Sequence, residues 1–357
     1  LEKMINFNLN LERDDFISSY NFARISDVVY SETVTEEQYL RLKLNDHTVI
    51  SRGKNIVFYK LNSFTLKEND IIFCNHSLIN ELFFHLNKID KFTNIKIITN
   101  QTDSSITEKL YLKKPSCVSK WYSINLDHRD LDLISIPLGL SNEYSPKNPK
   151  AEDFLNLYKK DIKKEDVALY MNFQENTNFN ERRKIYDYFV DKKWVVSSDP
   201  NLKMDSYLEE LNKHTFVLCP WGNGFETHRF WETLYAGSIP VLKHHHTYAS
   251  SENLPVLFVD EYEDINIELL KNFYNSVNKK TYNFEKLSMK YWEQEIKKGS
   301  IKSDDLAVAI KESKLINIKY FVKNTFKTQI DSKLKKIIYF IRQAKKLPNK
   351  LLSLIKK

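Results

Sequence analysis

The chain contains little glycine and cysteine, and it has no long hydrophobic run. Six of its 357 residues are glycine and three are cysteine. Cys74, Cys117 and Cys219 form no Cys-x-x-Cys pair and leave an odd thiol, which favours a reducing compartment over secretion. No stretch reaches 18 uncharged apolar residues, so no transmembrane helix is expected. We therefore expect a cytoplasmic protein.

Charge is divided unevenly along the chain. The net charge is +7 at pH 7, but residues 313–357 hold 13 Lys and Arg and a single acid, Asp331. Residues 1–312 consequently carry a net charge of −5. This pattern predicts a mildly acidic body followed by a strongly basic tail.

Short apolar runs alternate with helical stretches through the body. Asn55–Leu61, Asp70–Ser77 and Lys96–Ser105 read as strands in the first half, and Val167–Phe173 reads as a strand in the second. Such alternation predicts an α/β protein with parallel sheets. In these sheets ligands gather at the carboxyl ends of the strands, so polar residues at those ends are candidate site residues.

The length of the chain allows two hydrophobic cores of ordinary size, because 42% of its 357 residues are hydrophobic. The composition changes around 143–165, where prolines precede a charged helical stretch, and this region is the candidate linker. We therefore expect one α/β domain over 1–150, a second over 151–312, and the tail over 313–357.

The stretch Cys219–Val241 has the most distinctive pattern in the chain. It reads CPWGNGFETHRFWETLYAGSIPV and holds three of the six glycines. The pattern predicts a strand ending at Cys219, a glycine loop, a helix from about Thr227 to Ala236, and another strand. A helix that begins after a strand offers free N–H groups and a positive dipole to an anion. A phosphate group would bind there.

Arg229 and Glu232 lie three residues apart and therefore share a face of the predicted helix. They could meet the diphosphate and the ribose of a nucleotide, or they could form an ordinary ion pair. Gly222-x-Gly224-x-x-Thr227 nearly matches the dinucleotide fingerprint, but its third glycine is missing. The acidic residue expected about 20 positions later is also absent. A nicotinamide cofactor is therefore disfavoured.

These motifs resemble the nucleotide-binding segment of exostosin-like glycosyltransferases, most clearly over 214–242. That family has Cys-Pro-x-Gly-x-Gly, then Thr-His-Arg-x-Trp-Glu, then Gly-x-Ile-Pro-Val, and often Asp where this chain has Glu226. The matching positions are Cys219, Pro220, Gly222, Gly224, Thr227, His228, Arg229, Trp231, Glu232, Gly237, Ile239, Pro240 and Val241. The resemblance implies a GT-B fold, in which two Rossmann-like domains face a cleft. It also implies inversion, a nucleotide-sugar donor on the second domain, and no required metal or cofactor.

The donor-binding residues expected on this basis cluster in the second domain. They are Gly222, Asn223, Gly224, Thr227, His228, Arg229, Glu232 and, on an earlier helix, Arg182. Arg182 follows the predicted start of a helix at about Glu181 and lies on its apolar face. It could reach a bound anion, or its stem could simply cover apolar neighbours.

The general base that deprotonates the acceptor should come from the first domain. Asp103 is the first candidate and His76 the second, because each follows a predicted strand. The alternative is that each caps the next helix or turn. Asp130-Leu131-Asp132 has the Asp-x-Asp pattern of metal-dependent transferases, but the apolar run follows it, so we interpret it as a solvated strand entry. His244–His246 cannot all bind one metal and are expected in a donor-contacting or ordinary polar loop.

The tail contains a basic amphipathic pattern from Asp331 to Leu347. Leu334, Ile337, Ile338, Ile341 and Ala344 share one face, and Lys and Arg occupy the rest. This pattern favours contact of 331–357 with the inner face of an anionic membrane over a solvated helix packed on the body. Nucleic-acid binding is disfavoured because no recognised motif is present.

Together these expectations describe a transferase that moves a sugar from a nucleotide-sugar to a glycan or lipid-linked saccharide, in surface polysaccharide or glycan synthesis. Two other classes remain open. One is a different nucleotide-dependent enzyme with the same strand–loop–helix chemistry. The other is a non-catalytic, membrane-associated scaffold that keeps the fold.

Overall fold

The computed structural model describes residues 10–165, 168–300 and 306–312. The chain divides into two compact units, 1–310 and 311–357, and the first contains both large sheets. The predicted basic tail and its membrane contact lie outside the described residues. No helix within the described ranges is long and apolar enough to cross a bilayer.

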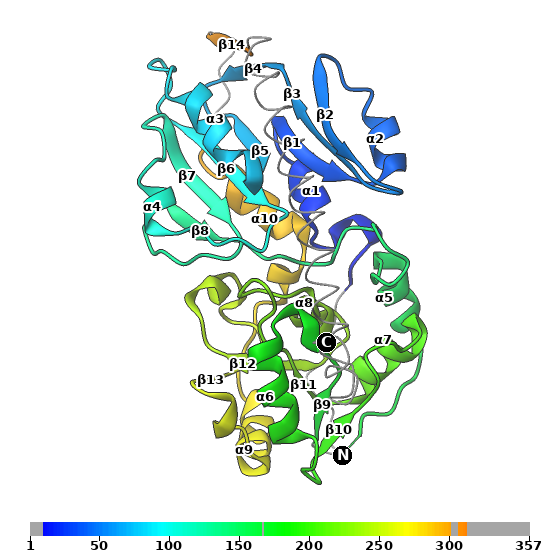
Figure 1. Cartoon of the computed structure of the whole chain (residues 1–357). Helices are drawn as coiled ribbons and strands as arrows, with labels where there is room; N and C mark the ends of the chain where they lie inside the picture. The colour runs from blue at the N-terminus through cyan, green and yellow to red at the C-terminus, as the bar shows by residue number, and fades with distance from the viewer. Residues whose placement is uncertain (1–9, 166–167, 301–305, 313–357) are drawn as a thin grey trace, which may run out of the picture. The chain divides into compact units, whose positions relative to one another are not determined.

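The first half of the chain forms a seven-stranded sheet with the order β2-β3-β1-β5-β6-β7-β8 (Figure 1). Its strands are β1 (Val28–Val34), β2 (His47–Arg52), β3 (Val57–Leu61), β5 (Ile71–Asn75), β6 (Ile95–Asn100), β7 (Val118–Ser123) and β8 (Leu133–Ser135). The five strands from β1 to β8 along this order are parallel, as predicted. The edge strand β2 and its neighbour β3 pair antiparallel, and β3 is also antiparallel to β1, which the sequence did not predict. The chain between Arg52 and Val57 is too short for a parallel crossover, so these strands form a hairpin.

Helices and connections pack on both faces of this sheet. Every residue of β5 and β6 is buried, which explains their continuous apolar runs. One core cluster joins α1 (Ser19–Arg24) with α10 (Met289–Lys297) on the strands. The Lys96 ammonium donates to the carbonyls of Ile296 and Lys298 at the end of α10, at 2.6 and 2.9 Å. A helix late in the sequence therefore belongs to the core of the first sheet. The remaining elements of this half are α2 (Glu36–Leu42), β4 (Ser63–Lys67), α3 (Ile79–Leu86) and α4 (Glu108–Tyr111).

The second half forms a five-stranded parallel sheet with the order β10-β9-β11-β12-β13. Its strands are β9 (Leu169–Met171), β10 (Val195–Ser197), β11 (Phe216–Leu218), β12 (Ile239–Lys243) and β13 (Leu257–Val259). Its helices are α5 (Ala151–Leu157), α6 (Phe179–Phe189), α7 (Met204–Lys213), α8 (His228–Tyr235) and α9 (Ile267–Val277). One core cluster contains side chains of α5, α7 and α8, and another contains those of α6 and α9. The expected α/β architecture with parallel sheets is thus confirmed.

All three cysteines are free and buried. Cys74 lies in β5, Cys117 precedes β7, and Cys219 directly follows β11. Burial raises the pKa of Cys74 and of Cys219 to about 12. Each sheet therefore contains an unreactive thiol in its core.

Hydrogen bonds join the two halves within the first unit. The backbone N–H of Leu138 donates to Glu226 Oε1 at 2.7 Å, and the N–H of Glu226 donates to Asn125 Oδ1 at 2.9 Å. The N–H of Leu126 donates to Thr247 Oγ1 at 2.9 Å. The loops that follow strands of the two sheets are therefore held against each other.

Gly139 lies in the segment that connects the halves, where only glycine fits. Its φ is +67°, and an added Cβ would lie 2.2 Å from the carbonyl oxygen of Ile17. The neighbouring N–H of Leu140 donates to that same oxygen at 2.7 Å, so the two segments cannot separate cheaply.

We predict that Gly139→Ala destabilises the protein far more than Gly299→Ala. Both glycines have φ near +70°, but nothing lies within 4 Å of a Cβ at Gly299. Gly299→Ala should cost about 1–2 kcal/mol of unfolding free energy for the left-handed backbone alone. Gly139→Ala should cost at least about 1 kcal/mol more because of the clash. Urea unfolding of both variants measures the difference, and equal losses would contradict the assigned contact.

Candidate functional site

A pocket of about 770 Å³ lies at the carboxyl ends of strands from both sheets. Asn100 at the end of β6, residues 101–103 after it and residues 222–224 after β11 line it, together with the first turns of α8. Part of the segment connecting the halves, including Leu138 and Asn142, lines it as well. It is the edge at which ligands bind in open α/β sheets.

Nine of the ten residues singled out from the sequence line this pocket. They are Asp103, Arg182, Gly222, Asn223, Gly224, Thr227, His228, Arg229 and Glu232. His76 is not among the lining residues: it begins a 3-10 turn after β5 and is 8% exposed. Burial lowers the pKa of His76. His76 does follow the end of β5, as predicted, but the chain turns inward at once, so the imidazole is enclosed by protein.

Arg182 fixes the shape of the glycine loop. Its Nε donates to the carbonyl of Trp221 at 2.7 Å, its Nη2 to that of Pro220 at 2.9 Å, and its Nη1 to that of Gln174 at 2.7 Å. Burial, and then the charge of Arg229, lower the pKa of Arg182 to about 10. All three guanidinium nitrogens thus donate to backbone carbonyls, so the residue holds the loop in shape.

Gly224 needs its missing side chain because the first half approaches it closely. A Cβ at this position would lie 2.9 Å from the amide atoms of Asn125. Next to it, Asn223 Nδ2 donates to Asp103 Oδ2 at 3.2 Å. The loop therefore meets residues that follow β6 and β7, and Asp103 faces the loop across the pocket.

The first turn of α8 brings its side chains to the pocket with few partners. Thr227 is the N-cap residue but makes no capping hydrogen bond. His228 Nδ1–H donates to the carbonyl of Gly139 at 2.8 Å and so ties the helix to the connecting segment. The guanidinium of Arg229 lies over the Tyr207 ring at 5.3 Å, and the Tyr207 hydroxyl donates to Glu232 Oε2 at 2.6 Å. Arg229 and Glu232 form no ion pair in the described part of the chain. The alternative of an ordinary i,i+3 ion pair is therefore not supported.

Five polar atoms on residues lining the pocket are buried without a hydrogen-bond partner among the described residues. One is Glu226 Oε2, and the other four are Asn100 Nδ2, Thr177 Oγ1, Thr227 Oγ1 and Arg229 Nη1. Each of these four can donate a hydrogen bond, and burying a donor without a partner costs about 1–3 kcal/mol. These donors, with the N–H groups at the start of α8, suit a ligand that has several acceptor oxygens and negative charge.

Sequence reasoning missed three of the residues that shape this pocket. The sequence placed Asn100 and Thr177 in polar loops. Of the two, only Asn100 could have been identified as a site residue, because it lies at the end of a predicted strand. Glu226 was noticed only as a departure from a motif. It is 4% exposed, and its Oε1 accepts from the Leu138 N–H and from Trp231 Nε1 at 2.7 and 2.6 Å. Burial raises the pKa of Glu226 to about 8.

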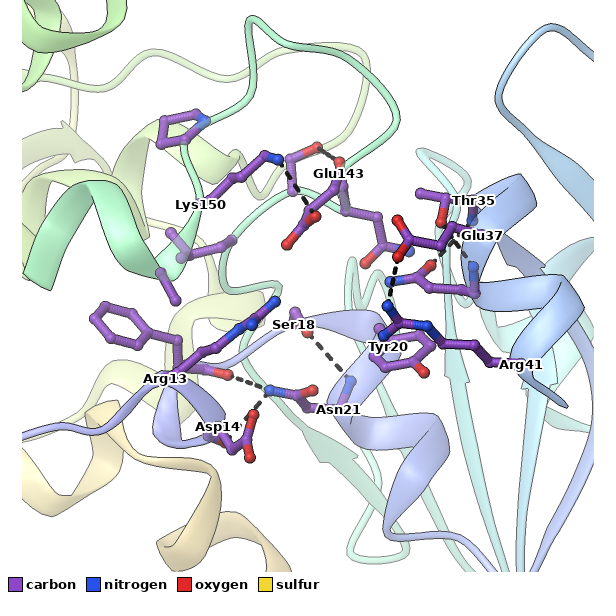
Figure 2. A pocket seen from close by; sticks show the side chains of 17 residues that line it. Arg13, Asp14, Ser18, Tyr20, Asn21, Thr35, Glu37, Arg41, Glu143 and Lys150 are labelled. Carbon is purple, nitrogen blue, oxygen red and sulfur yellow. Dashed lines mark hydrogen bonds and ion pairs between the residues drawn. The ribbon is translucent and has the colours of Figure 1, made fainter.

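A neighbouring pocket of about 600 Å³ differs in its electrostatics (Figure 2). It shares Ser141 and Asn142 with the first pocket. Its cations are paired with carboxylates: Arg13 with Glu152 at 2.7 Å, Lys150 with Glu143 at 3.5 Å, and Arg41 with Glu37. None of the residues predicted to bind the donor lines it. The first pocket is therefore the candidate active site.

Comparison with known proteins supports an enzyme of this class. Residues 171–298 match the family model of the RXYLT1 C-terminal domain, which is of the glycosyltransferase type. The matched range begins at the last residue of β9 and contains β10 to β13, the glycine loop and α8. It confirms the expected enzyme class, a glycosyltransferase. No curated protein sequence matches the chain.

Two crystal structures of alpha1,3-fucosyltransferase, one with GDP-fucose, show a weaker likeness. The first is 16% identical, with a TM-score of 0.35 over 65% of this chain and 79% of the other. The second is 16% identical, with a TM-score of 0.31 over 66% and 92%. TM-scores this low do not define the architecture of this chain, which rests on its own two sheets.

We predict that Glu226→Gln stabilises the protein increasingly as the pH rises from 5 to 9. Between the unfolded pKa near 4.5 and the folded value of about 8, native Glu226 keeps a proton that the unfolded chain releases, so rising pH favours unfolding. Glutamine keeps the acceptor for Leu138 and Trp231 but does not titrate. One pKa unit corresponds to about 1.4 kcal/mol, so a gain of at least about 1 kcal/mol is expected at pH 8.

Thermal unfolding of both proteins across this pH range measures the effect. Glu263→Gln is the matched control, because it makes the same substitution at an exposed glutamate. The buried carboxyl of Glu32, whose pKa burial raises to about 7, is present in all three proteins and cancels. A constant offset between wild type and Glu226→Gln at all pH values would contradict the assignment.

Proposed function

We propose that the protein is an exostosin-like GT-B glycosyltransferase that uses a nucleotide-sugar donor, inverts the anomeric centre and needs no metal ion. The observation that carries this proposal is the set of four buried donors left without partners around the glycine loop and α8. A nucleoside diphosphate supplies the acceptor oxygens and the negative charge that such a set requires. Its acceptor would be a glycan or a lipid-linked saccharide in surface polysaccharide or glycan synthesis.

The diphosphate would lie against Gly222–Gly224 and the start of α8. The guanidinium of Arg229 makes no hydrogen bond or ion pair among the described residues, whereas that of Arg182 donates to three carbonyls. Arg229 is therefore the arginine in this pocket that could bind the diphosphate. Thr227 Oγ1 and the helix N–H groups would add neutral donors. A fixed cation with fixed dipoles could offset the phosphate charge in the way a divalent ion does elsewhere.

Glu232 would hold the hydroxyl pair of the ribose. The residue is 7% exposed and lines the pocket one turn beyond Arg229. Tyr207 occupies its Oε2 and fixes the carboxylate, which leaves Oε1 for the ligand. The Tyr207 ring beneath Arg229 holds both functional side chains of α8 in place.

The transfer step would proceed by direct displacement. The acceptor oxygen forms a bond to the anomeric carbon while the bond from that carbon to the phosphate oxygen breaks, and the nucleoside diphosphate leaves with the electron pair. Arg229 and the α8 N-terminus stabilise the charge that develops on the leaving group. The acceptor proton passes to a base from the first half, for which Asp103 is supported by its place opposite the glycine loop. His76 has less support because it does not line the pocket.

We also propose that 331–357 contacts an anionic membrane, in which a lipid-linked acceptor would be anchored. This contact is supported by the amphipathic pattern and the net positive charge of that sequence.

Arg229→Ala should weaken nucleotide binding about 10- to 100-fold, because one charge-assisted hydrogen bond contributes about 1.5–3 kcal/mol. Isothermal titration with UDP, GDP and CMP in the presence of EDTA measures this. Arg183→Ala is the control, since Arg183 is an exposed arginine on α6 that pairs with Asp187. If no nucleotide binds to the wild type, or if Arg229→Ala binds as tightly, the proposed donor site is wrong.

Asp103→Asn should lower kcat at least about 100-fold, the lower range for removing a general base, and leave nucleotide affinity unchanged. Asparagine keeps an acceptor oxygen for Asn223, so the loop contact survives. Hydrolysis of candidate nucleotide-sugars in water provides an assay before the acceptor is known. Asp187→Asn on the surface of α6 is the control, and a kcat within twofold of wild type in Asp103→Asn would remove Asp103 from this role.

A further inference from the structure

A third cavity, of about 570 Å³, lies between the loops of the two halves and shares no residue with the candidate active site. Leu126 and residues 128–130 after β7 line it from the first half, and His244–His246 after β12 line it from the second. We call it the histidine cavity. The N–H of Leu126 and the hydroxyl of Ser135 both donate to Thr247, to its Oγ1 and its carbonyl respectively. These bonds hold its walls together.

The most distinctive lining groups are four imidazoles, those of His128, His244, His245 and His246. Thr247 N–H donates to His245 Nδ1 at 3.3 Å, so the His245 proton is on Nε2. His246 Nε2 is buried and has no hydrogen-bond partner among the described residues. Burial lowers the pKa of His245 to about 4 and also lowers that of His246. Neutral imidazoles each offer one donor and one acceptor, which matches hydroxyl groups.

The lining of the histidine cavity argues against a metal ion and against an anion as its ligand. In the described part of the chain, the one group of side chains close enough to share a metal includes none of these histidines. Arg129 is the only Arg or Lys in the lining, and Asp130 and Glu252 offset it. Apolar and aromatic groups complete the walls: Leu126, Leu133, Tyr248, Ala249 and Phe258. Apolar and aromatic surface, combined with imidazoles and with charged groups of both signs, fits a neutral saccharide ring.

The histidine cavity adjoins the candidate active site across a single loop. Phe225 stacks on His245 with ring centroids 3.8 Å apart and planes 15° apart. Trp221 contacts both rings edge-on, at 5.2 and 5.6 Å. The glycines between these two aromatic residues line the proposed donor pocket. A ligand in the histidine cavity would therefore lie beside the donor, separated from it by residues 221–226.

We propose that the histidine cavity binds a neutral sugar unit of the acceptor, one removed from the unit that carries the reacting hydroxyl. This inference rests on the proposed transferase function for the role of the sugar. The loop 221–226 would then contact the diphosphate of the donor on one side and a sugar of the acceptor on the other.

Saturation-transfer NMR on the full chain tests the inference. The probes are methyl glycosides and disaccharides of neutral hexoses and pentoses, with methyl glucuronide as an anionic counterpart. At least one neutral probe should bind, and His246→Ala and Arg129→Ala should each weaken it fivefold or more. Arg129 is exposed, so its replacement should not affect folding, and Arg183→Ala is the matched surface control.

Titration of UDP, GDP and CMP into the same samples reports on the donor site separately. Nucleotide affinity should be unchanged in His246→Ala and Arg129→Ala. The inference is overturned if no neutral saccharide binds, if the glucuronide binds better than every neutral probe, or if both variants bind like wild type. Saccharide binding that depends on His246, in a protein that binds no nucleotide, would support the cavity and overturn the proposed transfer.

Discussion

The engagement of Arg182 by three backbone carbonyls is the constraint on which the candidate active site depends. Two arginines reach this pocket, and two cations with the same freedom would compete for the same anion. Arg182 donates to the loop carbonyls of Pro220 and Trp221 and to the carbonyl of Gln174, in the connection that follows β9. Arg229 is left with a buried, unpartnered nitrogen. One guanidinium therefore shapes the loop while the other remains available, and the division follows from hydrogen-bond satisfaction alone.

The pocket also depends on contacts between the two halves, because neither sheet completes it. The glycine loop comes close to Asn125, and Glu226 accepts a hydrogen bond from Leu138. Each contact attaches the segment just before α8 to the first half. A buried carboxyl is a costly way to make such a contact, since it is stable there only while protonated or fully hydrogen-bonded. The Glu226 carboxyl lies beside the proposed diphosphate site, so its protonation contributes to the charge balance of the pocket.

The sequence predicted the parts of the site that are encoded locally. The loop, the start of α8 and the shared face of Arg229 and Glu232 follow from glycine spacing and helical periodicity, so they could be read from 219–241. The engagement of Arg182, the burial of His76 and the meeting of His128 with His244–His246 depend on contacts distant in sequence. Helical patterning likewise shows that α10 is amphipathic but not that it packs against the first sheet. Sequence periodicity identifies the apolar face of a helix, but only the tertiary structure shows which surface that face packs against.

The distribution of the buried thiols has a practical consequence. Cys74 belongs to the core of the first sheet and Cys219 lies at the end of a core strand of the second. Because the thiolate is the reactive species, both sulfurs are protected from alkylating reagents for as long as their own sheet is closed. The rates at which the two are labelled would report separately on the opening of each half. The protein thus contains an intrinsic probe of whether its halves unfold together or one at a time.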